Sequence, residues 1–148
     1  PAIFNWSKIM AEEAATKMLT KDDILGAMDL ATELVYMPEW GGSVLMKELN
    51  GAERDAYEAG SVHMGKAGQD PTPNLENLRA RLVAMSARDP KDEAKRMFTK
   101  AEAVKLGAKS GRALARLFNV AGRLSGIGDK AIKDIEGNSE AAQSGDSG

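Results

Sequence analysis

Two short runs of strand-forming residues flank Gly41-Gly42, and they constrain the fold of this chain more than any other feature. Residues 33–37 and 43–47 have strand composition, and a Gly-Gly turn between such runs predicts a β-hairpin over residues 33–49. An isolated hairpin is only marginally stable in water, so it must pack on helices or pair with another strand. The sequence offers no obvious third strand. We therefore expect an open sheet edge, which invites strand addition by a partner.

Most other segments have helical spacing, and each begins at a residue that commonly caps a helix. The strongest follows Ser110, and its apolar residues recur on one face. That face comprises Leu114, Leu117, Phe118, Ala121 and Leu124. Helices are expected at about residues 6–17, 21–28, 51–60, 75–87, 100–106 and 111–125. The prediction is a mainly α fold, a small helical domain of five to six helices with one β-hairpin near the N-terminal half.

Changes in composition divide the chain into three parts. Residues 1–17 are predicted to be an N-terminal extension with a short helix, and residues 18–136 the helical domain that contains the hairpin. Residues 137–148 consist of Gly, Ser, Ala, Gln, Asn and acids, which predicts a disordered acidic tail. Two glycines and two prolines in residues 61–73 predict a loop, and loops of this length tend to be functional or mobile.

The composition argues against several classes of protein. The chain has no cysteine, which excludes a disulfide scaffold, a thiol nucleophile and a Cys-ligated zinc ion. No run approaches the roughly 20 apolar residues that cross a bilayer, and residues 1–17 do not resemble a signal peptide. With His63 as its single histidine, the chain offers no ordinary catalytic triad and no spaced set of metal ligands. We expect a soluble cytosolic protein that is not an enzyme and has no catalytic residue, cofactor or metal ion.

Charge is segregated along the chain. Residues 1–73 carry six Lys/Arg and twelve Asp/Glu, residues 74–133 carry fourteen and six, and residues 134–148 carry none and four. An acidic front, a basic helical back and an acidic tail suggest a protein that works by contacting other proteins.

The most distinct pattern of charged residues is a basic stripe on and just before the last helix. Lys105, Lys109, Arg112, Arg116 and Arg123 recur at helical spacings, and from Lys109 onward they are expected opposite the apolar face. Three interpretations stay open: phosphate contacts with nucleic acid, a docking face for an acidic partner or for the acidic front of another copy, and a solvated helix face. The acidic pI of about 5.5, and the absence of interleaved aromatic, Asn or Gln side chains, argue against nucleic acid.

Trp40 beside the turn fits two roles, since it can fold onto the helices as core or anchor a partner at the hairpin tip. The candidate partner-binding residues lie on the hairpin and on the basic face. They are Met37, Trp40, Val44, Lys109, Arg112 and Arg116.

Several segments, taken in order, resemble a known family. They are residues 19–25 (LTKDDIL), 38–44 (PEWGGSV), 47–57 (KELNGAERDAY) and 106–114 (LGAKSGRAL). Together they resemble the tail assembly chaperones of long-tailed (siphovirus-type) phages that infect actinobacteria. The resemblance covers about residues 18–128. The chain departs from the family in its first 17 residues and in its longer loop at 60–73.

The resemblance implies a non-catalytic viral tail assembly factor. Members of the family coat the tape-measure protein, keep its apolar helices soluble, recruit tail-tube subunits in the host cytoplasm, and are absent from the mature virion. Many exist in a short form and a longer, frameshifted form. Self-association is a further expectation, and neither nucleic acid nor a membrane is an expected partner. The alternatives are a structural head–tail or tail-completion protein that stays in the virion and a small nucleic-acid-binding regulator.

Overall fold

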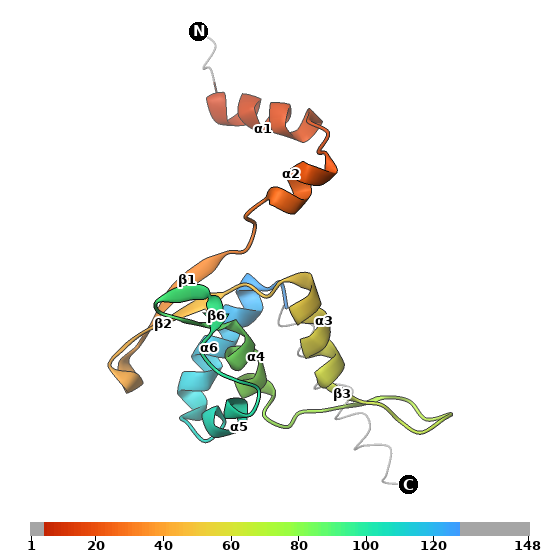
Figure 1. The fold of residues 1–148 in the computed structure, drawn as a ribbon, viewed down its shortest axis with the longest axis vertical. Coiled ribbons are helices and arrows are strands. Elements are labelled where there is room, and N and C mark those ends of the chain that lie inside the picture. The colour runs from red at the N-terminus through yellow and green to blue at the C-terminus, as the bar shows by residue number, and fades with distance from the viewer. Residues whose placement is uncertain (1–4, 128–148) are drawn as a thin grey trace.

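The computed structural model describes residues 5–127 of this chain, and Figure 1 shows their arrangement. This part of the chain contains helices and strands in comparable number. In chain order the elements are α1 (Trp6–Thr16), α2 (Lys21–Gly26), β1 (Thr32–Met37), the 3-10 helix η1 (Pro38–Trp40), β2 (Gly42–Lys47), α3 (Gly51–Gly60), β3 (Val62–His63), β4 (Thr72–Pro73), α4 (Leu78–Ser86), β5 (Ala87–Asp89), β6 (Asp92–Arg96), α5 (Glu102–Leu106) and α6 (Gly111–Leu124).

The predicted hairpin forms one side of a larger antiparallel sheet. β1 and β2 pair over six positions, from Thr32 opposite Lys47 to Met37 opposite Gly42. Gly41 closes the turn with a φ of +70°, a left-handed conformation that glycine adopts without steric cost. The strand order is β1-β2-β5-β6, so β2 is paired on both sides and only β1 and β6 have open edges.

The prediction of a mainly α domain with one hairpin is wrong, because the described residues form a mixed α/β fold. A four-stranded antiparallel sheet and a separate two-stranded sheet accompany the helices. β5 follows α4 without a loop, and the Asp89-Pro90 turn folds β6 back onto it. β6 consists of Asp, Glu, Ala, Lys and Arg, a composition that does not favour strands. The loop predicted at residues 61–73 contains the short ladder between β3 and β4.

The core lies between the sheet and the two helices α4 and α6. Of the apolar face predicted for α6, Leu114, Leu117, Phe118 and Ala121 are buried and Leu124 is half-buried. The sheet contributes buried side chains from one face of β1 and β2, which are Val35, Met37 and Met46. The end of α6 is joined to the segment between β2 and α3 by a hydrogen bond, since the Leu49 N–H donates to Ser125 Oγ at 3.0 Å.

An N-terminal arm, which we define as residues 5–31, lies outside this core. Figure 1 shows α1 and α2 extending away from the sheet and its helices, and neither helix has a buried residue. Both are locally capped: Asn5 accepts from the Lys8 N–H, and Thr20 and Asp23 form a reciprocal capping box. The predicted boundary after residue 17 falls between the two helices. The predicted acidic tail at 137–148 lies outside the described residues.

Candidate partner-binding surfaces

The hairpin candidates occupy different layers of the molecule. Met37 is fully buried and Val44 is half-buried, and both contribute to the apolar core. Trp40, at the hairpin tip, keeps 39% of its surface exposed. In this conformation Trp40 can reach a partner, whereas Met37 supports the hairpin from beneath.

The outer face of β1 carries two apolar side chains that the sequence-based selection missed. Leu34 is 67% exposed and Tyr36 is 66% exposed, while the alternate residues Val35 and Met37 are buried. Strand periodicity was the available signal, because side chains of alternate residues point to opposite faces of a sheet. Periodicity does not say which of the two faces of the strand is covered, because that depends on where α6 packs.

The open edge of β1 is available for hydrogen bonding. The Glu48 N–H donates to the Ala31 carbonyl at 2.8 Å, which makes residues 31 and 48 a hydrogen-bonded pair. In an antiparallel ladder such pairs alternate, so the backbone groups of Thr32, Leu34 and Tyr36 point away from β2 toward the open edge. The opposite edge, β6, is exposed at all five positions and mostly charged, a composition that disfavours strand addition.

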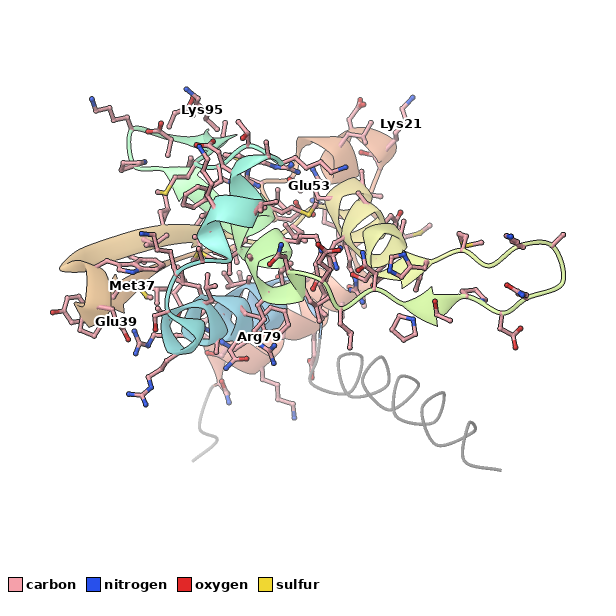
Figure 2. The ribbon with its side chains drawn as sticks, turned by 90° about the horizontal axis from the view of Figure 1, so that it is seen from below. Lys21, Met37, Glu39, Glu53, Arg79 and Lys95 are labelled. Carbon is pink, nitrogen blue, oxygen red and sulfur yellow. The ribbon has the colours of Figure 1, made fainter. Side chains whose placement is uncertain are left out.

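Much of the basic face of α6 is neutralised within the chain. Arg116 donates two hydrogen bonds to the Glu39 carboxylate, at 2.7 and 2.8 Å, and Arg123 donates to Glu33. The hydrogen bonds from Arg116 hold the pKa of Glu39 below its ordinary value. The acidic front and the basic back therefore meet in one molecule, at the hairpin (Figure 2, which labels Met37 and Glu39).

The two other basic candidates remain open to solvent. Lys109 and Arg112 are exposed, and neither forms an ion pair within residues 5–127. Of the three predicted basic partner-binding residues, Arg116 is thus hydrogen-bonded to the hairpin. Arg112 acts on Glu39 through its charge alone, which contributes to the lowered pKa of Glu39.

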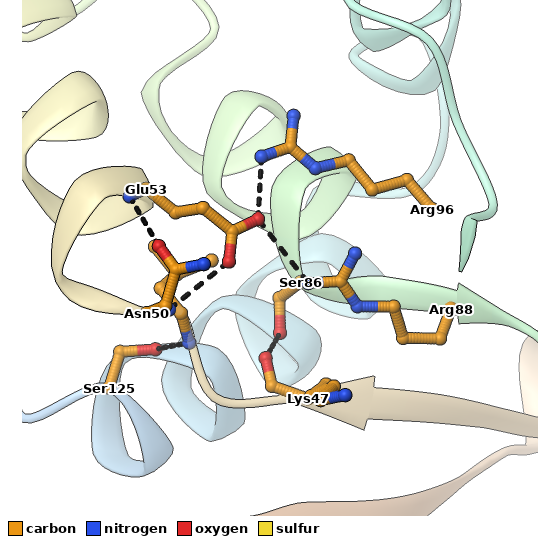
Figure 3. Close-up of polar contacts among 8 residues, drawn as sticks. Lys47, Asn50, Glu53, Ser86, Arg88, Arg96 and Ser125 are labelled. Atoms are coloured by element: carbon orange, nitrogen blue, oxygen red, sulfur yellow. Dashed lines mark hydrogen bonds and ion pairs between the residues drawn. The ribbon is translucent and has the colours of Figure 1, made fainter. Parts of the chain in front are cut away.

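Glu53 joins three elements at the other side of the sheet (Figure 3). It accepts the Asn50 N–H at 3.1 Å in the α3 capping box, and its carboxylate contacts Arg96 at 2.6 Å and Arg88 at 3.4 Å. Burial raises the pKa of Glu53, but the hydrogen bonds from Arg96 and Asn50 and the charge of Arg88 outweigh it and leave that pKa lowered. The cluster consists of satisfied ion pairs, so we assign it to stability.

Two adjoining apolar hollows share Phe98. One, of about 240 Å³, has Tyr57, Ala84 and Met85 on its walls, and the other, of about 390 Å³, lies between Trp40 and Leu106. We call the pair the cationic groove because five basic side chains also line it. They are Arg81, Arg96, Lys100, Lys105 and Lys109.

The described residues offer no arrangement typical of catalysis. No group of three or more His, Asp or Glu side chains within residues 5–127 could hold a metal ion, and His63 is exposed on β3. Burial raises the pKa of Tyr57 to about 12, and its hydroxyl donates to the Leu78 carbonyl, so it holds α3 against α4. The free backbone groups of β1 and the exposed apolar side chains are the features on which strand addition and apolar contact depend.

Comparison with known proteins returned no relative. No protein-family model, no curated protein and no solved structure matches the chain. Among the described residues, no helix combines the length and apolarity needed to span a bilayer.

Proposed function

We propose that this protein is a non-catalytic assembly chaperone that holds an apolar polypeptide, as the tail assembly chaperones it resembles do for the tape-measure protein. The observation that carries the proposal is the apolar surface that lies outside the core. Residues 18–36 alone contain seven large apolar side chains that are exposed. They are Met18, Leu19, Ile24, Leu25, Met28, Leu34 and Tyr36.

Such a surface suits a client made of apolar helices. Scattered single apolar residues are normal on a protein surface, but a concentration in one segment indicates a binding site. The exposed arm also contains Met10, Met18 and Met28. Methionine side chains are unbranched and flexible, so they can pack against varied partners. The exposed segment continues directly into β1, so the arm and the outer sheet face can contact one client.

The open edge of β1 supports the second half of the proposed role. A β-rich partner, such as a tail-tube subunit, could add a strand through the free backbone groups of Thr32, Leu34 and Tyr36. The ion pair between Arg116 and Glu39 holds the hairpin on α6, so the edge is ordered before any partner arrives. We assign the activity to the host cytoplasm during tail assembly and not to the finished particle.

Coexpression with a tape-measure fragment tests the proposal. We expect the fragment to be insoluble alone and to remain soluble and copurify with the full chain. The double variant L34S/Y36S is expected to retain at least tenfold less fragment, because burying one such side chain contributes about 1.5–3 kcal/mol. The matched control is Val104→Ser, which replaces a similarly exposed apolar residue on α5.

Two outcomes would count against this role. A fragment that stays insoluble beside the wild-type chain contradicts the holding activity, and equal retention by L34S/Y36S and the wild type contradicts the assigned surface. Mass spectrometry of purified virions gives a second readout, since detection of the protein there would favour a structural head–tail role.

A further inference from the structure

The cationic groove has an apolar floor and an excess of positive charge. Phe98 joins the two hollows, and Tyr57, Met85 and Leu106 extend the apolar lining on either side. Arg81 and Arg96 are engaged by neighbouring carbonyls and by Glu53, respectively. The rim lysines have no such hydrogen-bond partner, and among the described residues that line the groove Glu102 is the only acid.

Three rim lysines form no ion pair within residues 5–127, although the charge of Lys105 contributes to the lowered pKa of Glu102. Lys100, Lys105 and Lys109 are exposed and form no ion pair within the described part of the chain. An apolar floor with an unpaired cationic rim fits a short segment that is apolar on one side and acidic on another, since both contributions are then satisfied together.

The N-terminal arm of this chain has those properties. Residues 5–31 contain three Lys and five Asp/Glu, and no described residue of α1 or α2 is buried. α2 is already folded by its capping box, with Asp22 in its first turn and Ile24 and Leu25 exposed in its second. Preorganisation of this kind lowers the entropic cost of docking.

We propose that the arm of one copy docks in the cationic groove of a second copy. Ile24 and Leu25 cover the apolar floor around Phe98, and the acids Asp22 and Asp29 lie toward Lys105 and Lys109. The inference goes beyond the proposed chaperone role, because it concerns the chain with itself and needs no client.

The position of the arm favours a second copy over the arm's own groove. Five residues separate α2 from β1, and a segment of that length spans at most about 17 Å. Figure 1 shows the arm leaving the sheet at one end of the molecule, with α5 at the other end. Because arm and groove are different surfaces, docking either closes a dimer by exchange of two arms or continues from copy to copy.

The test is self-association of the full chain, without client, by sedimentation velocity over a wide range of concentration. We expect concentration-dependent association. The arm variant I24S/L25S and the groove variant K105E/K109E are each expected to weaken it at least tenfold. The control K91E/K95E makes the same charge change at the exposed strand β6, where Lys91 precedes the strand and Lys95 lies in it. It is expected to leave association unchanged.

Charge exchange tests the pairing itself. The arm variant D22K/D29K spares Asp23, whose carboxylate caps α2. Mixed with K105E/K109E, it is expected to associate more strongly than either variant alone, which a merely structural effect of the substitutions would not produce.

Each contrary result is decisive. A chain that stays monomeric at every concentration, or association that both I24S/L25S and K105E/K109E leave intact, overturns the proposal. A mixture of D22K/D29K and K105E/K109E that gains no association also overturns it. Client retention is measured separately, so the proposed function can fail or hold whatever these results are.

Discussion

The Glu53 cluster gives the sharpest test of how this fold is held together. We consider Glu53→Gln, which keeps the size of the side chain and an oxygen for the Asn50 N–H while removing the negative charge. The Arg88 side chain is only 6% exposed, and its Nε has no hydrogen-bond acceptor among residues 5–127. Glu53 is therefore the counter-charge that Arg88 depends on.

The magnitude follows from that burial. Removing one partner of a buried ion pair costs about 3–5 kcal/mol, because the other charge remains desolvated. The single Gln oxygen can replace Oε1 at the Asn50 N–H or Oε2 at Arg88, but not both. The Glu53 side chain is 15% exposed, so water reaches the site and places the loss near the lower limit. Arg96 is more exposed and adds at most about 1 kcal/mol. We expect a total loss of about 3 kcal/mol, a large share of the roughly 5–15 kcal/mol by which domains are stable.

Urea unfolding followed by circular dichroism measures this loss. With a slope of about 1.5 kcal/mol per molar urea, the midpoint is expected to fall by about 2 M at an unchanged slope. The matched control is Glu58→Gln, which breaks the exposed pair with Arg54 and is expected to cost less than about 0.5 kcal/mol. Adding Arg88→Met to Glu53→Gln removes the stranded charge and is expected to recover part of the stability. A loss below about 1 kcal/mol for Glu53→Gln would refute this reasoning.

The same residue predicts a pH dependence with a defined sign. The pKa of Glu53 is lower in the folded chain than its ordinary value of 4.5. Ionised Glu53 therefore stabilises the fold above that ordinary pKa, and its contribution is lost as the pH falls below about 4.5 toward the folded pKa. The midpoint difference between pH 7 and pH 3.5 is expected to be smaller in Glu53→Gln than in the wild type. Equal differences would show that the pKa of Glu53 does not change on folding.

Two further substitutions test how α6 is attached. Ser125→Ala leaves the buried Leu49 N–H without its acceptor and is expected to cost about 1–3 kcal/mol in urea unfolding, and a change within error would show that water replaces the hydroxyl. Arg116→Ala removes the two-bond contact with Glu39 and is expected to cost about 1 kcal/mol, less at high salt because the pair is partly exposed. A loss that does not vary with salt would mean that the packing of the Arg116 stem, and not its charge, holds the hairpin.

Local patterns in the sequence sufficed for the hairpin and for most of the helices. The exception is α4, which begins at Leu78, three residues later than predicted, and has no side-chain cap. The capping residues Thr20, Asn50 and Ser110 each accept the hydrogen bond expected of them, because a cap depends on neighbours three positions away. The buried face of α6 follows from helical spacing in the same way. The Gly-Gly turn identified the hairpin, because tight turns between strands need residues that adopt positive φ, as Gly41 does.

The rest of the sheet could not be predicted from local patterns. β6 has a composition typical of a solvated helix, and it is extended because β5 offers it an edge. β5 pairs with β2 across about 40 residues of sequence, a contact that depends on how α4 packs on α6.

The prediction of the candidate site from the sequence had the same limit. The basic stripe suggested an acidic partner, and two of its arginines contact acids of the hairpin. Those contacts join residues 77 and 90 positions apart, so spacing alone could not reveal that the partner charge lies in the same chain.

The two open edges of the sheet differ in a way that stability alone does not explain. β6 is charged at four of its five exposed positions, the composition by which proteins prevent edge-to-edge association. β1 is longer and pairs with β2 over six positions without a bulge. It also exposes Leu34 and Tyr36 on the face that points away from the core, so it has the features of an aggregation site. If β1 only had to complete the core, polar residues at positions 34 and 36 would remove this liability without disturbing the buried residues on its other face. The exposed Leu34 and Tyr36 are therefore better explained by a partner that covers them than by the needs of the fold.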